Sequence, residues 1–152
     1  MGQLIEKARI EDPPEILALV NEFASRQLML VLSLNGVYES LRDFFVCREE
    51  GAIVGCAALK NSWQGLGEVR SLAVRDEAQG QGIGQALVES CLAEARALGM
   101  KRVFVLTYIP EFFQKFGFVL CPKEKLPHKV WADCLDCPKF PDCDEVALIK
   151  DL

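Results

Sequence analysis

The chain has 152 residues, a formal net charge of −5, one histidine and seven cysteines. This length is typical of one folded domain, so we expect a single domain over residues 1–152. An acidic chain without a basic stripe argues against nucleic acid as a partner, because a phosphate backbone is bound by clustered lysines and arginines. No run of about 18 apolar residues and no apolar signal core is present, so we expect a cytoplasmic protein without a membrane partner.

The N-terminal third is predicted from its helix and turn signals. Residues 3–10 are expected to form a strand, and Asp12 is the expected N-cap of a helix that begins with two prolines and carries an apolar stripe. A second short helix is predicted over Glu39–Phe44. Phe45–Arg48 and Ala52–Leu59 then form a predicted hairpin around a Glu-Glu-Gly turn.

The middle of the chain joins a strand to a helix through a glycine-rich loop. Glu68–Val74 is the predicted central strand, and Gln79–Gly84 leads into a helix whose apolar residues recur at three- and four-residue steps as far as Gly99, the expected αL cap. Glycines let backbone N–H groups approach a phosphate, and the helix N-terminus adds the positive end of its dipole. This segment therefore predicts a phosphate-bearing cofactor.

Two other phosphate-binding loops fit this segment less well. A Walker loop needs Gly-Lys-Ser/Thr, but Gly84 is followed by Gln85 and Ala86. A Rossmann fingerprint needs G-x-G-x-x-G near the chain start and an acidic residue about 20 positions later, whereas the spacing here is G-x-G-x-G in mid-chain. Dinucleotide binding is therefore the weaker interpretation.

The C-terminal third supplies the last predicted elements. These are a strand over Arg102–Tyr108, a short helix over Ile109–Phe116, the pair Gly117-Phe118, a further strand, and a closing strand over Glu145–Ile149. The order β-α-α-β-β-β-α-β-α-β-β predicts an α/β fold, α+β by convention, with a mixed central sheet and helices on both faces.

From Leu66 to Leu120 the sequence resembles the GNAT acyltransferases. The resemblance rests on Gln79-x-x-Gly82-x-Gly84, which matches the family's Q/R-x-x-G-x-G/A loop, and on the order of the elements around it. It implies the GNAT acyl-CoA N-acyltransferase fold and acetyl-CoA as cosubstrate, with the pyrophosphate on the loop and the pantetheine arm on the preceding strand. The residues that it assigns to acetyl-CoA are Leu72, Ala73, Val74, Gln79, Gly80, Gln81, Gly82, Ile83, Gly84, Gln85 and Phe113.

Acetyl transfer to an amine requires a base, because most α-amines are protonated at neutral pH. The resemblance implies that Glu68 is this base and acts through ordered water; the alternative is an exposed strand-end carboxylate without a catalytic part. Strand alternation places Arg70 on the same face as Glu68, so Arg70 either binds a carboxylate of the substrate or pairs with Glu68. Many family members protonate the departing thiolate with a tyrosine, but this chain has Phe113 there, which leaves Tyr108, water or an unprotonated thiolate.

Further segments resemble the acetyltransferase domain of bacterial N-acetylglutamate synthases, in a short form without the amino-acid-kinase domain. They are Lys7–Asp12, Gly55–Leu59, Leu106-Thr107 and Phe113–Phe118. This resemblance implies L-glutamate as acceptor, in arginine biosynthesis. GNAT domains are often dimers, so a homodimer is a further expectation that no residue of this sequence decides.

The expected acceptor region departs from that branch at one position. Leu32 stands where such synthases usually have arginine, so Arg26 or Arg42 is the candidate replacement, each otherwise a solvated helix residue whose stem covers apolar surface. The alternatives are another amine acceptor, such as a different amino acid, a polyamine or a protein N-terminus, and a non-catalytic module that senses acetyl-CoA or a metal.

A cysteine-rich segment over residues 121–143 lies inside the expected domain. His128, Cys134, Cys137 and Cys143 have the spacing H-x5-C-x2-C-x5-C, and thiolates with imidazole suit a closed tetrahedral zinc site. Cys121 is a substitute fourth ligand. A structural zinc ion is therefore one prediction; free thiols in a folded tail and a redox or disulfide switch are the alternatives. The three remaining cysteines, which are Cys47, Cys56 and Cys91, are expected in the core.

Overall fold

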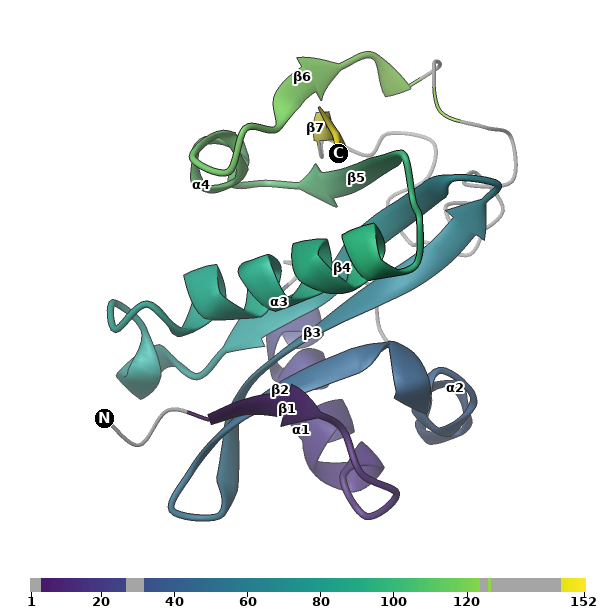
Figure 1. Ribbon diagram of the computed structural model, residues 1–152. Coiled ribbons are helices and arrows are strands. Elements are labelled where there is room, and N and C mark those ends of the chain that lie inside the picture. Colours follow the sequence, from purple (N-terminus) through teal and green to yellow (C-terminus); the bar gives the residue numbers. More distant parts are fainter. Residues whose placement is uncertain (1–3, 27–31, 124–125, 127–145) are drawn as a thin grey trace. The chain divides into compact units, whose positions relative to one another are not determined.

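The structure is a computed structural model, and it describes residues 4–26, 32–123, 126 and 146–152 (Figure 1). Seven strands form one mixed sheet in the order β1-β2-β3-β4-β5-β7-β6. The elements follow the predicted order and confirm the predicted fold class. They are β1 (Leu4–Lys7), α1 (Pro13–Ser25), α2 (Leu34–Glu39), the 3-10 turn η1 (Leu41–Asp43), β2 (Phe44–Glu49), β3 (Ala52–Trp63), β4 (Leu66–Val74), the 3-10 turn η2 (Asp76–Ala78), α3 (Ile83–Ala97), β5 (Arg102–Thr107), α4 (Pro110–Gln114), β6 (Val119–Cys121) and β7 (Val146–Asp151).

The chain divides into two compact units. The first unit comprises residues 1–59 and 69–94, and the second comprises residues 60–68 and 95–152. The single domain expected from the chain length therefore stays a prediction. Among the described residues, no helix is both long and apolar enough to cross a membrane.

The first unit has its own hydrophobic core, formed between α1, α2 and the strands beside them. Phe23 of α1 and Val37 of α2 pack in one cluster with Phe44 of β2. Strand β2 pairs antiparallel with both β1 and β3. The β2–β3 connection confirms the predicted hairpin: Glu50 and Gly51 have φ values of 52° and 81°, and two successive positive φ values give a turn that suits the twist of paired strands.

One sequence prediction in the first unit is confirmed and one is wrong. Asp12 is the N-cap residue of α1, as predicted, but its side chain makes no capping hydrogen bond; its carboxylate instead accepts from the backbone N–H of Arg9 at 2.6 Å and from Arg48. The predicted helix over Glu39–Phe44 is only the 3-10 turn η1 (Leu41–Asp43), and the short α-helix is α2, which lies earlier and ends at Glu39. The Ser33 hydroxyl caps α2 by accepting from a backbone N–H at 3.0 Å, whereas Phe44 is extended because its ring fills the core at the start of β2. The other predicted boundaries shift by a few residues, and β1 ends at Lys7.

The second unit is built around β5 and β7. Strand β5 pairs along its whole length with antiparallel β7, from Arg102 opposite Asp151 to Thr107 opposite Val146, and β6 covers the other edge of β7. Phe104 is fully buried in the core of this unit. At the end of α3, the N–H of Met100 donates to Ala95 at 3.0 Å and Gly99 has φ +84°, which confirms the predicted αL cap.

A buried ion pair fixes the turn between β1 and α1. The Arg48 side chain is 14% exposed and donates to Glu6 at 2.6 Å and to Asp12, whose side chain is only 4% exposed. Burial alone would raise the pKa of Asp12, but hydrogen bonds from Arg48 and from the N–H of Arg9 outweigh it, so this pKa lies below its ordinary value of 3.8. The ionised carboxylate therefore stabilises the folded chain above that pH.

Replacing Arg48 by methionine is expected to lower the free energy of unfolding by about 3 kcal/mol at pH 7, because Asp12 then stays buried without its cation. Urea unfolding measures the change. The lowered pKa of Asp12 means that the contribution of the pair is lost as the pH falls below 3.8, so the difference from the wild type should shrink there. Arg102→Met removes an exposed pair with Asp151 and should change stability by less than about 0.5 kcal/mol. Equal effects of the two substitutions would contradict this account.

Candidate active site

The glycine-rich loop adopts a backbone that only glycine accepts without strain. Gly80 and Gly82 have φ values of 80° and 83°, and no atom lies within 4 Å of the position that a Cβ would take on either residue. The N–H of Ala86 donates to the carbonyl of Gly82 at 3.0 Å, so the first turn of α3 follows the loop directly. Backbone N–H groups in a first helical turn have no partner within the helix, and they suit an anion.

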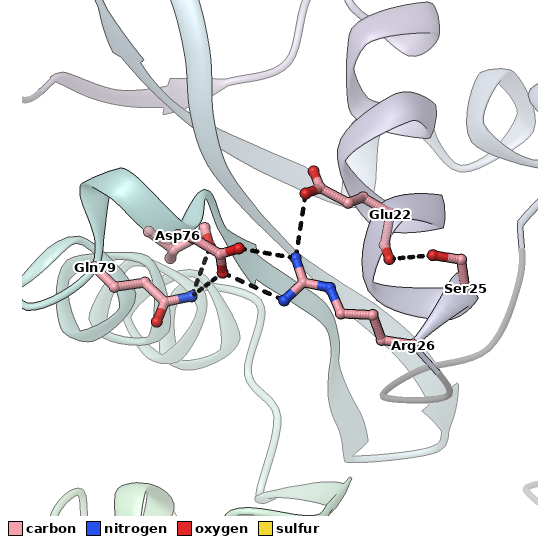
Figure 2. A network of polar contacts seen from close by, with 6 residues as sticks. Glu22, Ser25, Arg26, Asp76 and Gln79 are labelled. Atoms are coloured by element: carbon pink, nitrogen blue, oxygen red, sulfur yellow. Dashed lines mark hydrogen bonds and ion pairs between the residues drawn. The ribbon is translucent and has the colours of Figure 1, made fainter.

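The turn before this loop is closed by the side chain of Gln79. Its amide nitrogen Nε2 donates to the carbonyl of Val74 at 3.0 Å and to Oδ1 of Asp76 at 3.4 Å (Figure 2). The backbone N–H of Arg75 donates to the carbonyl of Val54 at 2.8 Å. The end of β4, η2 and the start of the loop are therefore held by hydrogen bonds within the first unit.

Arg26 is the C-cap residue that follows α1, and its partly exposed side chain points toward η2 (Figure 2). Its guanidinium pairs with Asp76 at 3.1 Å and Glu22 at 3.2 Å, and lies 4.6 Å from the ring centroid of Phe23. The hydrogen bond to Asp76 is the main cause that raises the pKa of Arg26 above its ordinary value. The sequence prediction made Arg26 a ligand of the substrate; its guanidinium already holds two carboxylates of the chain.

Strand β4 carries an irregularity that no sequence pattern predicts. Ser71 has φ +56°, which is rare for a residue with a side chain, and its carbonyl accepts from Sγ of Cys56 at 3.5 Å. The extended backbone is interrupted there, so the alternation predicted from Glu68 to Val74 does not run unbroken through the strand. Ala73 is buried in the core of the first unit, while Leu72 and Val74 are half-buried.

Glu68 lies at the end of a short ladder in the second unit. The parallel pairing of β4 with β5 runs from Leu66 to Glu68, and Glu68 lies opposite Phe104. Glu68 is buried, with only 8% of the residue exposed. The interpretation of Glu68 as an exposed strand-end carboxylate is therefore wrong, since a carboxylate is rarely buried without a partner or a role.

Comparison with known proteins assigns the family. Residues 40–120 match the family model described as acetyltransferase (GNAT) domain. The chain belongs to the GNAT acetyltransferase family. An uncharacterised N-acetyltransferase of Chlorobaculum tepidum is 39% identical over 148 residues, which cover 97% of this chain and 96% of that protein. An amino-acid acetyltransferase of Mycobacterium tuberculosis is 41% identical over 118 residues, which cover 76% of this chain and 67% of that protein.

Solved structures agree with this assignment. A Mycobacterium tuberculosis protein in complex with CoA has a TM-score of 0.84 and 32% identity, with 98% of this chain and 99% of that chain covered. The N-acetylglutamate synthase of Neisseria gonorrhoeae, complexed with coenzyme A and N-acetyl-glutamate, has a TM-score of 0.87 and 27% identity. The match covers 99% of this GNAT chain but only 35% of that synthase.

The aromatic position that departs from the family pattern is part of the core. Phe113 is 2% exposed, and its ring meets those of Phe112 and Phe118 edge to face at centroid distances of 5.1 and 5.7 Å. Gly117 has φ +90°, so its backbone favours glycine; a Cβ there would lie 2.7 Å from Nζ of Lys150, which is the flexible end of that side chain. The assignment of Phe113 to acetyl-CoA stays a prediction, as does the role of Tyr108.

The predicted site residues of this GNAT chain belong to two different units. Those in the first unit are Arg26, Arg70, Leu72, Ala73, Val74, Gln79, Gly80, Gln81, Gly82, Ile83, Gly84 and Gln85, and those in the second are Glu68 and Phe113. Ile83 as a whole is 1% exposed, so its side chain is part of the core and offers no exposed surface to a cofactor. Sequence reasoning missed Asp76, which joins Arg26 to Gln79; an acidic residue before a glycine loop is too common to signal such a contact.

The cysteines fall into two groups. Cys47, Cys56 and Cys91 are buried free thiols, as predicted, and burial raises the pKa of Cys56 and of Cys91 to about 12, so both stay protonated. The predicted zinc ligands lie outside the described residues; they are His128, Cys134, Cys137 and Cys143. Within the described part of the chain, no group of three or more His, Cys, Asp or Glu side chains is arranged to hold a metal ion.

Proposed function

We propose that this GNAT enzyme transfers the acetyl group of acetyl-CoA to the α-amine of L-glutamate. The observation that carries the cosubstrate is the open left-handed backbone of Gly80 and Gly82 at the start of α3, which suits a pyrophosphate. The acceptor is supported by the relative named amino-acid acetyltransferase and by the likeness to a synthase that was solved with N-acetyl-glutamate.

In this mechanism the free amine attacks the thioester carbonyl carbon directly. The C–N bond forms, the C–S bond breaks, and CoA leaves as a thiolate. Glu68 accepts the amine proton through water, and a proton from Tyr108 or water neutralises the thiolate. Arg70 binds a carboxylate of the acceptor, because a planar guanidinium matches a carboxylate at two points. Positioning the two substrates supplies the rest of the rate enhancement.

The remaining parts of the proposal follow from the resemblance to N-acetylglutamate synthases and from the cysteine spacing. They are a role in arginine biosynthesis, a cytoplasmic location, a homodimer, and a structural zinc ion on the cysteine-rich segment. All four proposals rest on the sequence. The zinc ligands, in particular, lie outside the described residues.

A second candidate keeps the reaction and changes the acceptor. The observation that favours it is the packing of Leu32, an apolar residue at the position where such synthases usually have arginine. Its side chain packs against the core of the first unit, and its backbone N–H and carbonyl bind the Asn21 side chain at 3.2 and 3.3 Å. An apolar residue held in this way supplies no charge to a second carboxylate, so a less acidic amine would suit this position.

The experiment that tests the function is mass spectrometry of the products formed from acetyl-CoA and an equimolar mixture of the free amino acids, with a polyamine and a short peptide offered in parallel reactions. We expect N-acetylglutamate as the main product, because Arg70 and the relatives both indicate an acidic amino acid. Another acetylated amino acid as the main product would favour the second candidate. No product from any free amino acid, polyamine or peptide N-terminus would contradict the enzyme and leave a sensing module. A reaction without the protein controls for chemical acetylation.

A further inference from the structure

One carboxylate joins the end of α1 to the glycine-rich loop. Asp76 accepts from Nη1 of Arg26 at 3.4 Å on Oδ1 and from Nη2 at 3.1 Å on Oδ2, so the contact has two points. The same Oδ1 accepts from the Gln79 amide at 3.4 Å. Figure 2 shows Asp76 between the two donors, with Arg26 arriving from α1 and Gln79 from the start of the loop.

A second ion pair of opposite polarity links the same segments. Glu15, on the first turn of α1, lies 3.9 Å from the guanidinium of Arg75, the residue before Asp76. Glu15 also accepts the backbone N–H of Ile53 in β3 at 2.7 Å. The segment that leads into the loop is therefore paired with both ends of α1, by a cation at position 75 and by an anion at position 76.

We propose that Arg26 and Asp76 are positioning residues that hold the Gln79–Gly84 loop in the form that binds the pyrophosphate of acetyl-CoA. This inference rests on the proposed function. Arg26 orients the Asp76 carboxylate, the carboxylate orients the Gln79 amide, and the amide closes the turn onto the carbonyl of Val74. The inference replaces the prediction that Arg26 binds a carboxylate of the acceptor.

The expected loss of CoA affinity follows from how far the Arg26 and Asp76 side chains are exposed to solvent. The side chains of Arg26 and Asp76 are 40% and 58% exposed, so water screens their attraction and the pair adds little to folding stability. A preformed loop nevertheless spares the ordering cost on binding. We therefore expect a loss of affinity for CoA of about three- to fivefold when the pair is broken, with kcat unchanged.

The test is the dissociation constant of CoA, measured by calorimetry, for the wild type, Arg26→Met, Asp76→Asn and the double variant. We expect each single substitution to weaken CoA binding three- to fivefold and the double variant to be no weaker than the poorer single one, because both changes break one chain of contacts. Glu22→Gln is the matched control. It removes the negative charge of the other carboxylate that pairs with Arg26, on α1 itself, and should leave CoA binding unchanged.

Steady-state kinetics then separate the two roles of Arg26. A rise in KM for acetyl-CoA alone supports the inference, whereas a rise in KM for the acceptor with unchanged CoA affinity makes Arg26 a substrate ligand and overturns it. Additive effects of Arg26→Met and Asp76→Asn overturn it as well. A wild type that does not bind CoA contradicts the proposed function instead. Thermal unfolding checks each variant, and Arg26→Lys, which keeps the charge but not the two-point contact, replaces Arg26→Met if the latter unfolds at the assay temperature.

Discussion

Replacing Glu68 by glutamine is expected to lower kcat about 100-fold at neutral pH, because an amide cannot accept the proton of the attacking amine. Glu68 is 8% exposed as a residue, and glutamine keeps the shape of its side chain, so the packing of the second unit should survive. The loss should shrink as the pH rises, since a growing fraction of the acceptor amine is then deprotonated without help from the enzyme. Initial rates at saturating acetyl-CoA and acceptor, measured over a range of pH, provide the test.

A control carboxylate distinguishes a base from a general effect of charge. Glu11 is exposed in the turn before α1, and Glu11→Gln should retain wild-type turnover. CoA affinity of Glu68→Gln should also equal that of the wild type, because the proposed cofactor loop lies elsewhere in the chain. Wild-type kcat for Glu68→Gln at every pH would show that Glu68 is not the base. Loss of CoA binding would point to a structural fault.

The order of the elements was predictable because its strongest signals are local. A glycine after a periodic apolar helix predicted the αL cap at Gly99, just beyond the end of α3, and a Glu-Gly turn between apolar runs predicted the hairpin. Helix α2 was misplaced because its six residues are too few to show a period and include Gly36. Its start depends on a single hydroxyl, that of Ser33, and at its end the N–H and the hydroxyl of Ser40 donate to the carbonyl of Gly36.

The site was predictable only where a motif carries the chemistry. The loop glycines follow from spacing, and the left-handed backbone at Gly80 and Gly82 agrees with the prediction for that loop. The contact of Arg26 with Asp76 joins residues that are 50 positions apart, so no local pattern announces it. The positive φ of Ser71 is equally hidden, because serine has no preference for that conformation and the surrounding structure imposes it.

The largest effect on cofactor binding is expected at Gly82. Replacing it by alanine forces a side chain into the left-handed region at φ +83°, which costs roughly 1 kcal/mol of folding stability. No protein atom lies within 4 Å of the new methyl group, so the chain itself has room for it. The methyl group instead takes the space in which a pyrophosphate would approach the backbone N–H groups. We expect the dissociation constant of CoA to rise at least tenfold, which is about 1.4 kcal/mol of binding free energy.

Gly99→Ala separates the effect of backbone strain from the loss of the pyrophosphate-binding loop. Gly99 has φ +84° and is equally open around a Cβ, so its replacement should cost the same folding stability, while it lies beyond the other end of α3 from the loop. Calorimetry with CoA and thermal unfolding on both variants give the comparison. If Gly82→Ala alone weakens CoA binding and both variants lose the same stability, the loop binds the cofactor through its backbone. If both variants bind CoA equally well, the pyrophosphate lies elsewhere. That result would exclude the glycine-rich loop as its binding site and, with it, the positioning role of Arg26 and Asp76.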